Sequence, residues 1–386
     1  MRASRPSTLT DDASCSGTVK LCFAPPGVNP RVCGQKTVHR SFYVLGGANV
    51  DILLVYGGRS AERRISLESA GFVAEVLDAA GHNLIRLEIG AKGEWTLDDG
   101  PVQLRALPES WKLAGQDGVV DFDLVFPVLH GPLGEDGTVQ GLCEMAGWRY
   151  AGADVMTSSL AMNKVATKRM FEWRRLPVLP WITVRASRSL STSELTGELS
   201  PPVFVKPARL GSSIGITRVD NLDRLEDALD HAYSYDCLLV VEKALDRARE
   251  IEVSVLGGPD GASASMPGEV LPGKEWYDYE AKYECEDSRL VIPADLSSDL
   301  ASRLKTTAEK AFEVLGGTGF ARVDFLLSPK GDLYVNEVNT IPGFTSISMF
   351  HRLWEASGIP PKRLMERIIS EALTRRRIGR ERPVGE

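Results

Sequence analysis

Two carboxylates and an amide near the C-terminal end carry the clearest chemical signal of the sequence. Asp324, Glu337 and Asn339 lie in two apolar, β-rich runs, 321–328 and 333–340, which flank the turn sequence Pro-Lys-Gly-Asp. Proline and glycine are strong turn signals, so the two runs are predicted to form a β-hairpin. Carboxylate and amide oxygens are hard ligands that suit Mg²⁺, which proteins usually hold with one or two carboxylates together with substrate phosphates.

The pairing register of this hairpin decides whether these side chains can act together. We expect Ser328 to face Leu333, which sets Asp324 opposite Glu337 and puts Arg322 on the same face, because side chains alternate with a period of two. Directly opposed Cβ atoms lie about 4.5–5.5 Å apart, so two carboxylates there would repel unless a cation or a proton lay between them. A solvated strand face is the alternative, and the hairpin alone leaves both interpretations open.

Two loops carry residue types that suit anions. Residues 130–137, HGPLGEDG, follow a predicted strand end, where open α/β sheets place ligands. Residues 211–215 form a Gly-Ser loop after Lys206; glycine lets backbone N–H groups approach an anion, and lysine supplies positive charge for phosphate. This second loop does not match the standard P-loop pattern. Taken alone, the first loop could be an ordinary turn before a helix, and the second is weak evidence.

Hydrophobic periodicity predicts the elements that position these residues. A buried strand is expected at 50–58, an amphipathic helix that ends at Gly81, and strands at 83–87 and 123–129. Strands that alternate with helices are typical of an α/β domain with a parallel sheet. Further strands are predicted up to Lys206, at 238–243 and at 250–255, and further helices at 158–175, 299–315 and 362–375.

Length and composition narrow the function classes. The chain has 386 residues, enough for two or three domains, and its 43% hydrophobic and 25% charged residues are ordinary for a soluble protein. A net charge of −7 gives no electrostatic footprint for nucleic acid. No apolar run approaches the roughly 18–20 residues of a membrane span. The six cysteines show no CxxC pair, and we expect free thiols in the cytoplasm.

Three segments differ from the rest in composition. Residues 1–47 are rich in Ser, Pro and Gly without periodicity and are predicted to be a disordered N-terminal extension. Residues 271–290 are long, aromatic and charged, which favours a lid over a site; a disordered insertion is the alternative, although such segments are poor in aromatic residues. The end of the chain, 379–386, is predicted to be a frayed tail.

Several motifs occur in one order along the chain. They are GGRSAE, HGPLGEDG, MNK, VKPARLGSSIG, VEK with REIEVSV, EWYDYEAKY, ARVDF and NEVNTIPGFTS. This series resembles the ATP-grasp superfamily and, within it, the D-alanine–D-alanine ligases. The resemblance implies an ATP-grasp fold with an N-terminal α/β substrate domain, a central subdomain and a C-terminal catalytic domain, at 48–152, 153–241 and 242–378.

The resemblance also implies ATP and two Mg²⁺ ions, or Mn²⁺ in their place. The residues that it puts at the nucleotide are Lys164 and Lys206 for the phosphates, Glu242 for the adenine, Glu250 for the ribose, and Gly211, Ser212 and Ser213 in the Gly-Ser loop. The metal ligands that it implies are Asp324, Glu337 and Asn339, in agreement with the hairpin argument.

Two amino-acid sites are implied in the same way. In such ligases a carboxylate, here Glu62, binds the ammonium group of the first D-alanine and is linked through Ser212 to a lid tyrosine, here Tyr283. The first-substrate loop contains His130 and Glu135. The groups implied for the acceptor are Ser348, Met349 and Lys282, and those implied to stabilise the acyl phosphate and the tetrahedral intermediate are Arg322 and the backbone around Gly343.

The reaction implied by the resemblance has two steps and yields D-alanyl-D-alanine, a precursor of peptidoglycan. The carboxylate of one D-alanine attacks ATP, and the amine of a second displaces phosphate from the resulting acyl phosphate. Tyr283 favours an amine acceptor; D-lactate and D-serine are the alternatives. A silent nucleotide-binding regulator would have lost metal ligands or phosphate lysines, which are all present. The family suggests a homodimer. Asn163 and Met349 depart from the usual aspartate and leucine.

Overall fold

The computed structural model describes most of the chain after residue 48. The described residues are 49–97, 100–106, 111–115, 118–186, 199–258, 261–271 and 289–375. The predicted N-terminal extension, the C-terminal tail, and Lys282 and Tyr283 of the predicted lid lie outside these ranges. No helix within them is both long and apolar enough to cross a bilayer.

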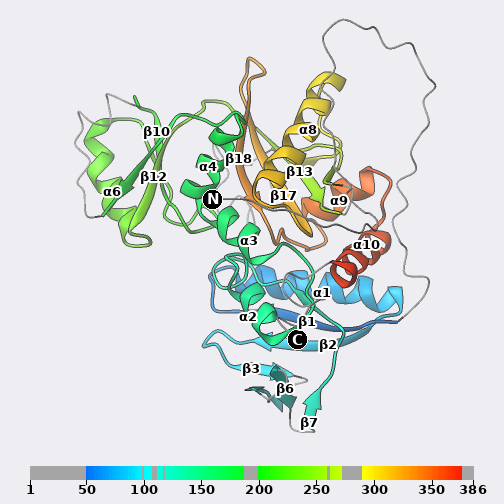
Figure 1. Ribbon diagram of the computed structural model, residues 1–386. Helices are drawn as coiled ribbons and strands as arrows, with labels where there is room; N and C mark the ends of the chain where they lie inside the picture. Colours follow the sequence, from blue (N-terminus) through cyan, green and yellow to red (C-terminus); the bar gives the residue numbers. More distant parts are fainter. Residues whose placement is uncertain are drawn as a thin grey trace, which may run out of the picture. The chain divides into compact units, whose positions relative to one another are not determined.

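A parallel sheet forms the first part of the described chain (Figure 1). Strand β1 (Asp51–Gly57) pairs in parallel with β2 (Asn83–Ile89) and with β8 (Leu124–Pro127), which confirms the predicted parallel α/β arrangement. Helix α1 (Arg63–Ala80) lies between β1 and β2 in sequence and ends where Gly81 adopts the left-handed backbone, φ 91°. The sheet is completed by β3 (Trp95–Leu97) and β4 (Gly100–Pro101) in the order β4-β3-β2-β1-β8.

Sequence periodicity missed the short elements of this region. A separate antiparallel sheet has the order β5-β6-β7, and helix α2 follows the loop after β8. Strands of two to five residues are too short to establish a hydrophobic period. Their bounds are β5 (Gln103–Ala106), β6 (Trp111–Gly115), β7 (Gly118–Val120) and α2 (Thr138–Ala146).

The single helix predicted at 158–175 is wrong, because the chain breaks there into α3 (Val155–Met162) and α4 (Lys164–Trp173). Between them Asn163 has an extended backbone, φ −93° and ψ 96°, and its side-chain oxygen accepts hydrogen bonds from the N–H groups of Val165 and Ala166 in the first turn of α4. Asparagine caps a helix about as well as aspartate. The break therefore puts Lys164 at the first position of a capped helix.

The second sheet is antiparallel and has the order β11-β10-β12-β9. It contains β10 (Val203–Pro207), which carries Lys206, and β12 (Leu238–Lys243), both at predicted strand positions. Helix α6 packs its apolar face against this sheet. The other elements are β9 (Trp181–Arg185), β11 (Thr217–Val219), the short 3₁₀ helix η1 (Leu222–Arg224) and α6 (Leu225–Tyr233).

The third sheet carries the hairpin and has the order β16-β15-β13-β17-β18, with β14 also paired to β13. Its strands are β13 (Arg249–Leu256), β14 (Ser263–Ala264), β15 (Gly268–Leu271), β16 (Arg289–Val291), β17 (Phe320–Leu327) and β18 (Leu333–Asn339). Helix α8 (Ser298–Val314), close to its predicted bounds, buries Leu304 and Phe312 against this sheet.

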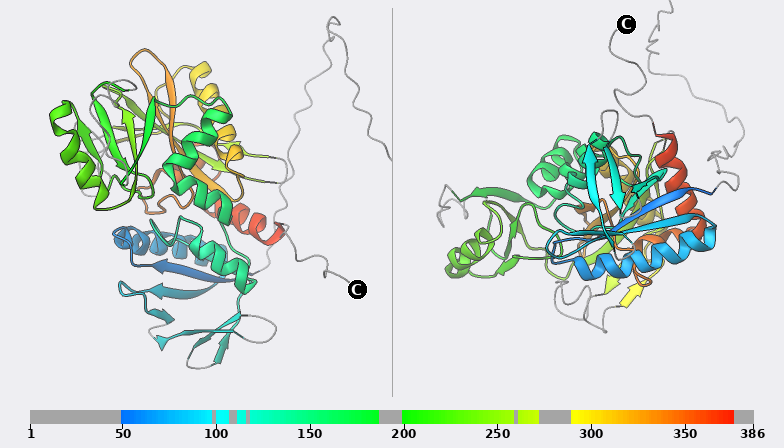
Figure 2. Two further views of the ribbon diagram at one scale, coloured as in Figure 1. Left: turned by 60° about the vertical axis from the view of Figure 1, so that its left-hand side comes forward. Right: turned by 90° about the horizontal axis from the view of Figure 1, so that it is seen from below.

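Two C-terminal helices, α9 (Met349–Ala356) and α10 (Pro361–Thr374), return to the N-terminal sheet. Figure 2 shows the red α10 beside the blue α1, and the two helices are in contact. One hydrophobic core contains side chains from both ends of the described chain. Its members include Ile52, Leu77, Phe126, Phe320, Phe344, Phe350, Leu364 and Ile369.

The hairpin register is partly as predicted. Next to the turn Leu327, not Ser328, faces Leu333, so the prediction is wrong there by one residue. A bulge after Asp324 then shifts the pairing, so that Asp324 does face Glu337. A bulge adds one residue to one strand, here β18, and so moves the register by one. The predicted pairing of Asp324 with Glu337 is therefore confirmed, but it depends on the bulge and not on the regular register that was predicted.

Candidate active site

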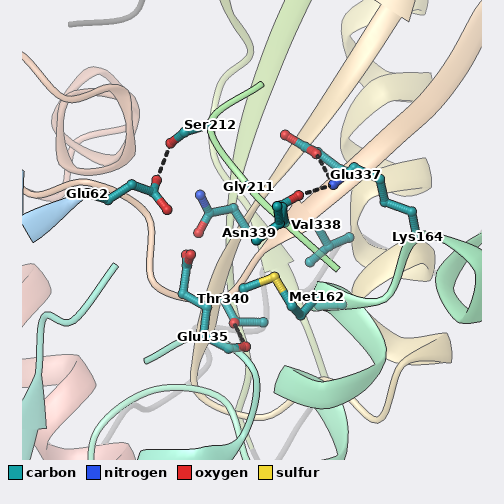
Figure 3. Close-up of a pocket in the computed structure, with 12 residues that line it drawn as sticks. Glu62, Glu135, Met162, Lys164, Gly211, Ser212, Glu337, Val338, Asn339 and Thr340 are labelled. Carbon is teal, nitrogen blue, oxygen red and sulfur yellow. Dashed lines mark hydrogen bonds and ion pairs between the residues drawn. The ribbon is translucent and has the colours of Figure 1, made fainter. Parts of the chain in front are cut away.

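One pocket of about 510 Å³ is formed where the N-terminal loops, helix α4, the Gly-Ser loop and strand β18 meet (Figure 3). This volume includes open solvent at the mouth, so the residues that line the pocket, and not its size, identify it as a candidate site. The predicted residues that line it are Glu62, Glu135, Lys164, Gly211, Ser212, Glu337 and Asn339. Sequence positions more than 250 residues apart thus contribute to one site.

On one side of this pocket the hydroxyl of Ser212 donates a hydrogen bond to Oε1 of Glu62. Glu62 is only 6% exposed and precedes α1 directly. Ser212 has a positive φ of 50°, which non-glycine residues rarely adopt, so the Gly-Ser loop is held in an unusual backbone conformation. Gly131 comes so close that a Cβ there would lie 2.4 Å from Oε2 of Glu62.

On the opposite side Lys164 reaches two groups. Its Nζ donates to the carbonyl of Leu210 at 2.5 Å and lies 3.9 Å from Oε2 of Glu337. Its backbone N–H donates to the carbonyl of Ala208 at 2.8 Å. The ammonium group therefore connects the Gly-Ser loop to the carboxylate of the hairpin.

A third carboxylate, that of Glu135 from the loop after β8, also lines this pocket. Burial, together with the negative charge of Glu62, raises its pKa well above the usual value, while a hydrogen bond of 2.7 Å from the N–H of Gly131 opposes the rise. Glu135 is therefore more readily protonated than an exposed glutamate. A neutral carboxyl group there reduces the repulsion among the acidic residues of the pocket.

Arg322, on the same strand as Asp324, is held by two acidic residues. Its Nε and Nη2 donate to the two carboxylate oxygens of Asp324, both at 2.6 Å, and Nε lies 3.1 Å from Oε2 of Glu252. The sequence prediction missed Glu252. On the neighbouring strand β13 this residue pairs with Asp324, so the strand order, which sequence reasoning lacked, identifies it.

A second pocket, of about 840 Å³ including solvent at its mouth, lies beside the first. The predicted residues that line it are Lys206, Ser213, Glu242 and Glu250. Ser212 lines the first pocket and Ser213 the second, so one loop separates the two.

Glu242, predicted to meet the adenine, is ion-paired with two lysines. Oε1 contacts Nζ of Lys168, and Oε2 lies 2.6 Å from Nζ of Lys206. Burial opposes the charged form, but the two ammonium groups outweigh it and lower the pKa of Glu242 to about 2. Lys168 was not predicted to belong to the site. It follows Lys164 by four residues on α4, a spacing that puts both lysines on one face of the helix.

His130 lies outside these two pockets and contacts the loop after β18. Its Nδ1 lies 2.9 Å from the carbonyl of Ile341, which can only accept, so Nδ1 carries the proton. Its Nε2 then accepts from the hydroxyl of Ser69 at 3.0 Å, and that oxygen accepts from the N–H of Phe344 at 3.1 Å. Burial lowers the pKa of His130 to about 4, which keeps the ring neutral.

The predicted acceptor residues follow on the same loop. Ser348 directly precedes α9, and its Oγ accepts from the N–H of Thr345 at 2.9 Å. A Cβ on Gly343 would lie 2.8 Å from this oxygen, so only glycine fits there without movement. Met349 is buried beside Val270 and Leu353. None of these residues lines either of the two pockets described above.

The chemistry of the hairpin residues fits a hard divalent cation. Asp324 and Glu337 face each other, and the side-chain oxygen of Asn339 accepts one hydrogen bond, from Ile341, and retains a second lone pair. Within the described residues no cluster of three or more His, Cys, Asp or Glu side chains suits a metal. A set of two carboxylates and one amide is what Mg²⁺ needs when substrate phosphates complete its coordination.

Comparison with known proteins identifies relatives of the whole described chain. A family model described as D-ala D-ala ligase N-terminus matches residues 51–153, and one described as D-ala D-ala ligase C-terminus matches residues 170–370. A D-alanine–D-alanine ligase of Heliobacterium modesticaldum is 41% identical over 352 residues, which cover 84% of this chain and 95% of the relative. A second, from Clostridium acetobutylicum, is 39% identical and covers 84% of this chain and 98% of the relative.

Solved structures agree with these relatives. The D-alanine–D-alanine ligase of Coxiella burnetii has a TM-score of 0.76 and 32% identity, covering 84% of this chain and 94% of its own. A D-Ala:D-Ser ligase of Enterococcus faecalis also has a TM-score of 0.76, with 30% identity, covering 84% of this chain and all of its own.

Proposed function

Since the chain belongs to the D-alanine–D-alanine ligase family, we propose that it joins two D-alanine molecules into D-alanyl-D-alanine and converts ATP to ADP and phosphate. The observation that carries this proposal is the pair of pockets on either side of the Gly-Ser loop, one rich in carboxylates and one lined by Lys206, Glu242 and Glu250. A ligase of this kind must hold an amino acid next to a polyphosphate, and two adjoining pockets supply that arrangement.

In the first step a carboxylate oxygen of the first D-alanine attacks the γ-phosphorus of ATP. An O–P bond forms, the bond to the β-phosphate oxygen breaks, and ADP leaves. Two anions must approach each other, so nearby positive charge lowers the barrier. We assign this role to Lys164, Lys206 and Arg322, and we assign the substrate ammonium group to Glu62.

In the second step the amine of the second D-alanine attacks the acyl carbon. A C–N bond forms, the C–O bond to phosphate breaks, and the amine loses a proton. We assign the oxyanion to the backbone around Gly343 and the acceptor carboxylate to Ser348, Met349 and Lys282. Acyl phosphates hydrolyse in water, so the predicted lid with Tyr283 would protect the intermediate.

We further propose that Asp324, Glu337 and Asn339 bind two Mg²⁺ ions, for which Mn²⁺ could substitute. The ions would supply positive charge to the transferring phosphoryl group. Asp324 already accepts two hydrogen bonds from Arg322, so the arginine fixes the direction in which its remaining lone pairs point. The tight contact between the two residues thus orients a metal ligand as well as a phosphate-binding cation.

The acceptor is proposed to be D-alanine, while a related ligase of Enterococcus faecalis is named for D-serine. Tyr283 is the residue that favours an amine over a hydroxyl acceptor. A coupled assay of phosphate release, with D-alanine, D-serine and D-lactate offered as acceptors at neutral pH, tests the assignment. Faster product formation with D-lactate or D-serine than with D-alanine would overturn it, and release of ADP without any amino acid would overturn ligation itself.

Two further properties belong to the same proposal. The protein would act in the cytoplasm, where ATP is available, to make a peptidoglycan precursor. It would form a homodimer, as the family resemblance suggests. Sedimentation velocity of the full chain at micromolar concentration measures the second property directly.

A further inference from the structure

A turn at residues 345–348 positions Ser348, and the side chain of His351 is hydrogen-bonded to the first residue of that turn. The carbonyl of Thr345 accepts from the N–H of Ser348 at 2.9 Å and lies 2.8 Å from Nε2 of His351. A carbonyl can only accept, so Nε2 of His351 carries the proton and donates it. The two residues of the turn also share a hydrogen bond of 2.8 Å between their hydroxyl oxygens.

The Ser348 hydroxyl is directed into this turn and away from the helix that follows. Ser348 has the extended backbone of an N-cap residue, φ −66° and ψ 139°, yet its side chain caps no N–H group of α9. A serine at this position would usually make such a cap. Its oxygen instead contacts Thr345, so the direction of the hydroxyl depends on where the Thr345 peptide lies.

The ring of His351 has one orientation available to it. It is 4% exposed and stacks on the ring of Phe72 from α1, with centroids 4.4 Å apart and planes 25° from parallel. The edge of the ring therefore contacts the Thr345 carbonyl, while its face packs on Phe72 of α1. These two contacts connect the turn to the N-terminal part of the fold.

The other ring nitrogen of His351, Nδ1, indicates that a histidine at this position lowers the stability of the fold. Nδ1 is buried and has no hydrogen-bond partner, and a buried polar atom without a partner carries a free-energy penalty. An apolar side chain of similar size would stack on Phe72 without that penalty. The hydrogen bond from Nε2 is the one contribution that such a side chain could not make.

We propose that His351 is a positioning residue for the acceptor amino acid: by fixing the carbonyl of Thr345 it sets the direction of the Ser348 hydroxyl toward the acceptor carboxylate. This inference rests on the proposed function, which puts the acceptor at Ser348. It predicts an effect confined to the second substrate, because the contacts of Lys164, Glu62 and Glu242 do not pass through this turn.

Two matched variants test the proposal. His351→Gln keeps an N–H donor near the position of Nε2. The side chain in His351→Asn is shorter by one methylene group, so its N–H donor lies near the position of Nδ1 and cannot reach the Thr345 carbonyl. We expect the Asn variant to raise KM for the second D-alanine about tenfold, the range of one lost hydrogen bond, and the Gln variant to stay within about twofold of the wild type. KM for ATP and for the first D-alanine should change less than twofold in both.

A third variant separates positioning from stability. Phe72→Leu loosens the packing of the same ring but leaves its donor in place, so it should lower Tm by as much as His351→Asn without raising KM for the second D-alanine to the same extent. The proposal is overturned if the Gln and Asn variants raise that KM equally, or if all KM values rise together. Failure of the wild type to release ADP in response to D-alanine would instead overturn the proposed function.

Discussion

Ser212 hydrogen-bonds to Glu62 across 150 positions of the sequence, and this contact closes the Gly-Ser loop over the start of α1. The loop also carries Ser213, which lines the second pocket. A movement of the loop would therefore change both pockets together. The contact therefore links the shape of the first pocket to the shape of the second.

Removing this hydroxyl should weaken the first amino-acid site. Ser212→Ala leaves one oxygen of Glu62 without its donor, and we expect KM for the first D-alanine to rise about tenfold. Initial rates over a range of D-alanine concentrations, fitted with separate constants for the two sites, measure this. Ser234→Ala removes an exposed hydroxyl that bonds only to the carbonyl of His231 and is the control. A change limited to KM for ATP would contradict the expectation.

Glu337→Gln should abolish turnover at any Mg²⁺ concentration. Glu337 faces Asp324 across the hairpin and lines the first pocket, so the substitution removes one charge of the proposed metal-binding carboxylate pair. ADP release during a Mg²⁺ titration tests turnover, and paramagnetic Mn²⁺ binding in the presence of ADP tests the site without catalysis. Glu313→Gln, on the exposed side of α8, should change neither. Near wild-type turnover in the first variant would exclude the hairpin as the metal site.

Glu252→Gln should lower kcat through Arg322. The substitution removes one of the two negative charges that hold the guanidinium group, and we expect a loss of about tenfold, below the roughly 10²–10³-fold cost of deleting a transition-state donor. Glu269→Gln disrupts a comparable ion pair with Arg249 in the same sheet and serves as the matched control. It should reduce Tm and leave kcat unchanged. Equal effects of the two variants on kcat would show that Glu252 acts only through stability.

The break at Asn163 can be tested by stability and by nucleotide binding. Asn163→Ala removes the cap of α4 and should cost about 1 kcal/mol of unfolding free energy, while Asn163→Asp should be nearly neutral. Because Lys164 is the first residue of this helix, the Ala variant should also raise KM for ATP. Urea unfolding and ATP titrations measure the two effects. An Ala variant as stable as the wild type would mean that the observed cap contributes nothing.

His130 should make stability depend on pH. Its pKa in the folded protein is about 4, below the usual 6.5, so the unfolded chain takes up the proton first as pH falls. The stabilisation by neutral His130 is complete above about pH 7 and is lost progressively between pH 6.5 and 4, in total about 3 kcal/mol. Urea unfolding at several pH values measures this: between pH 7 and 4 the unfolding free energy of His130→Gln should fall by about 3 kcal/mol less than that of the wild type. Parallel curves for the two proteins would contradict the shifted pKa.

The long periodic elements and the carboxylate pair could be predicted from the sequence, whereas the contacts between elements could not. The pairing of Asp324 with Glu337 was predicted with a ladder that is wrong at Leu333, because a bulge in β18 leaves no signature in residue types. The role of Glu252 depends on which strand lies beside β17, a relation that no local pattern contains. The break between α3 and α4 was missed because apolar spacing continues through it.

Among the site residues, too, those in local sequence patterns were predicted and those defined by contacts between elements were not. Glu62 and Lys164 were named from motifs and Glu337 from the alternation of the hairpin strands, and all three line one pocket. Lys168 and His351 were missed, since a lysine or a histidine on a helix has no pattern that separates a buried contact from an exposed one. Their importance arises from Glu242 and Thr345, which approach them only after folding.

The core that joins α1 to α10 also determines when the protein can fold during synthesis. Side chains such as Ile52 and Leu77 are buried against Leu364 and Ile369 of α10, the last described helix. The first sheet cannot complete its core until almost the whole chain has left the ribosome. Until then its apolar strands are exposed to other chains and to chaperones. The N-terminal sheet, which is synthesised first, can therefore complete its core only after α10, which is synthesised last among the described helices, has been made.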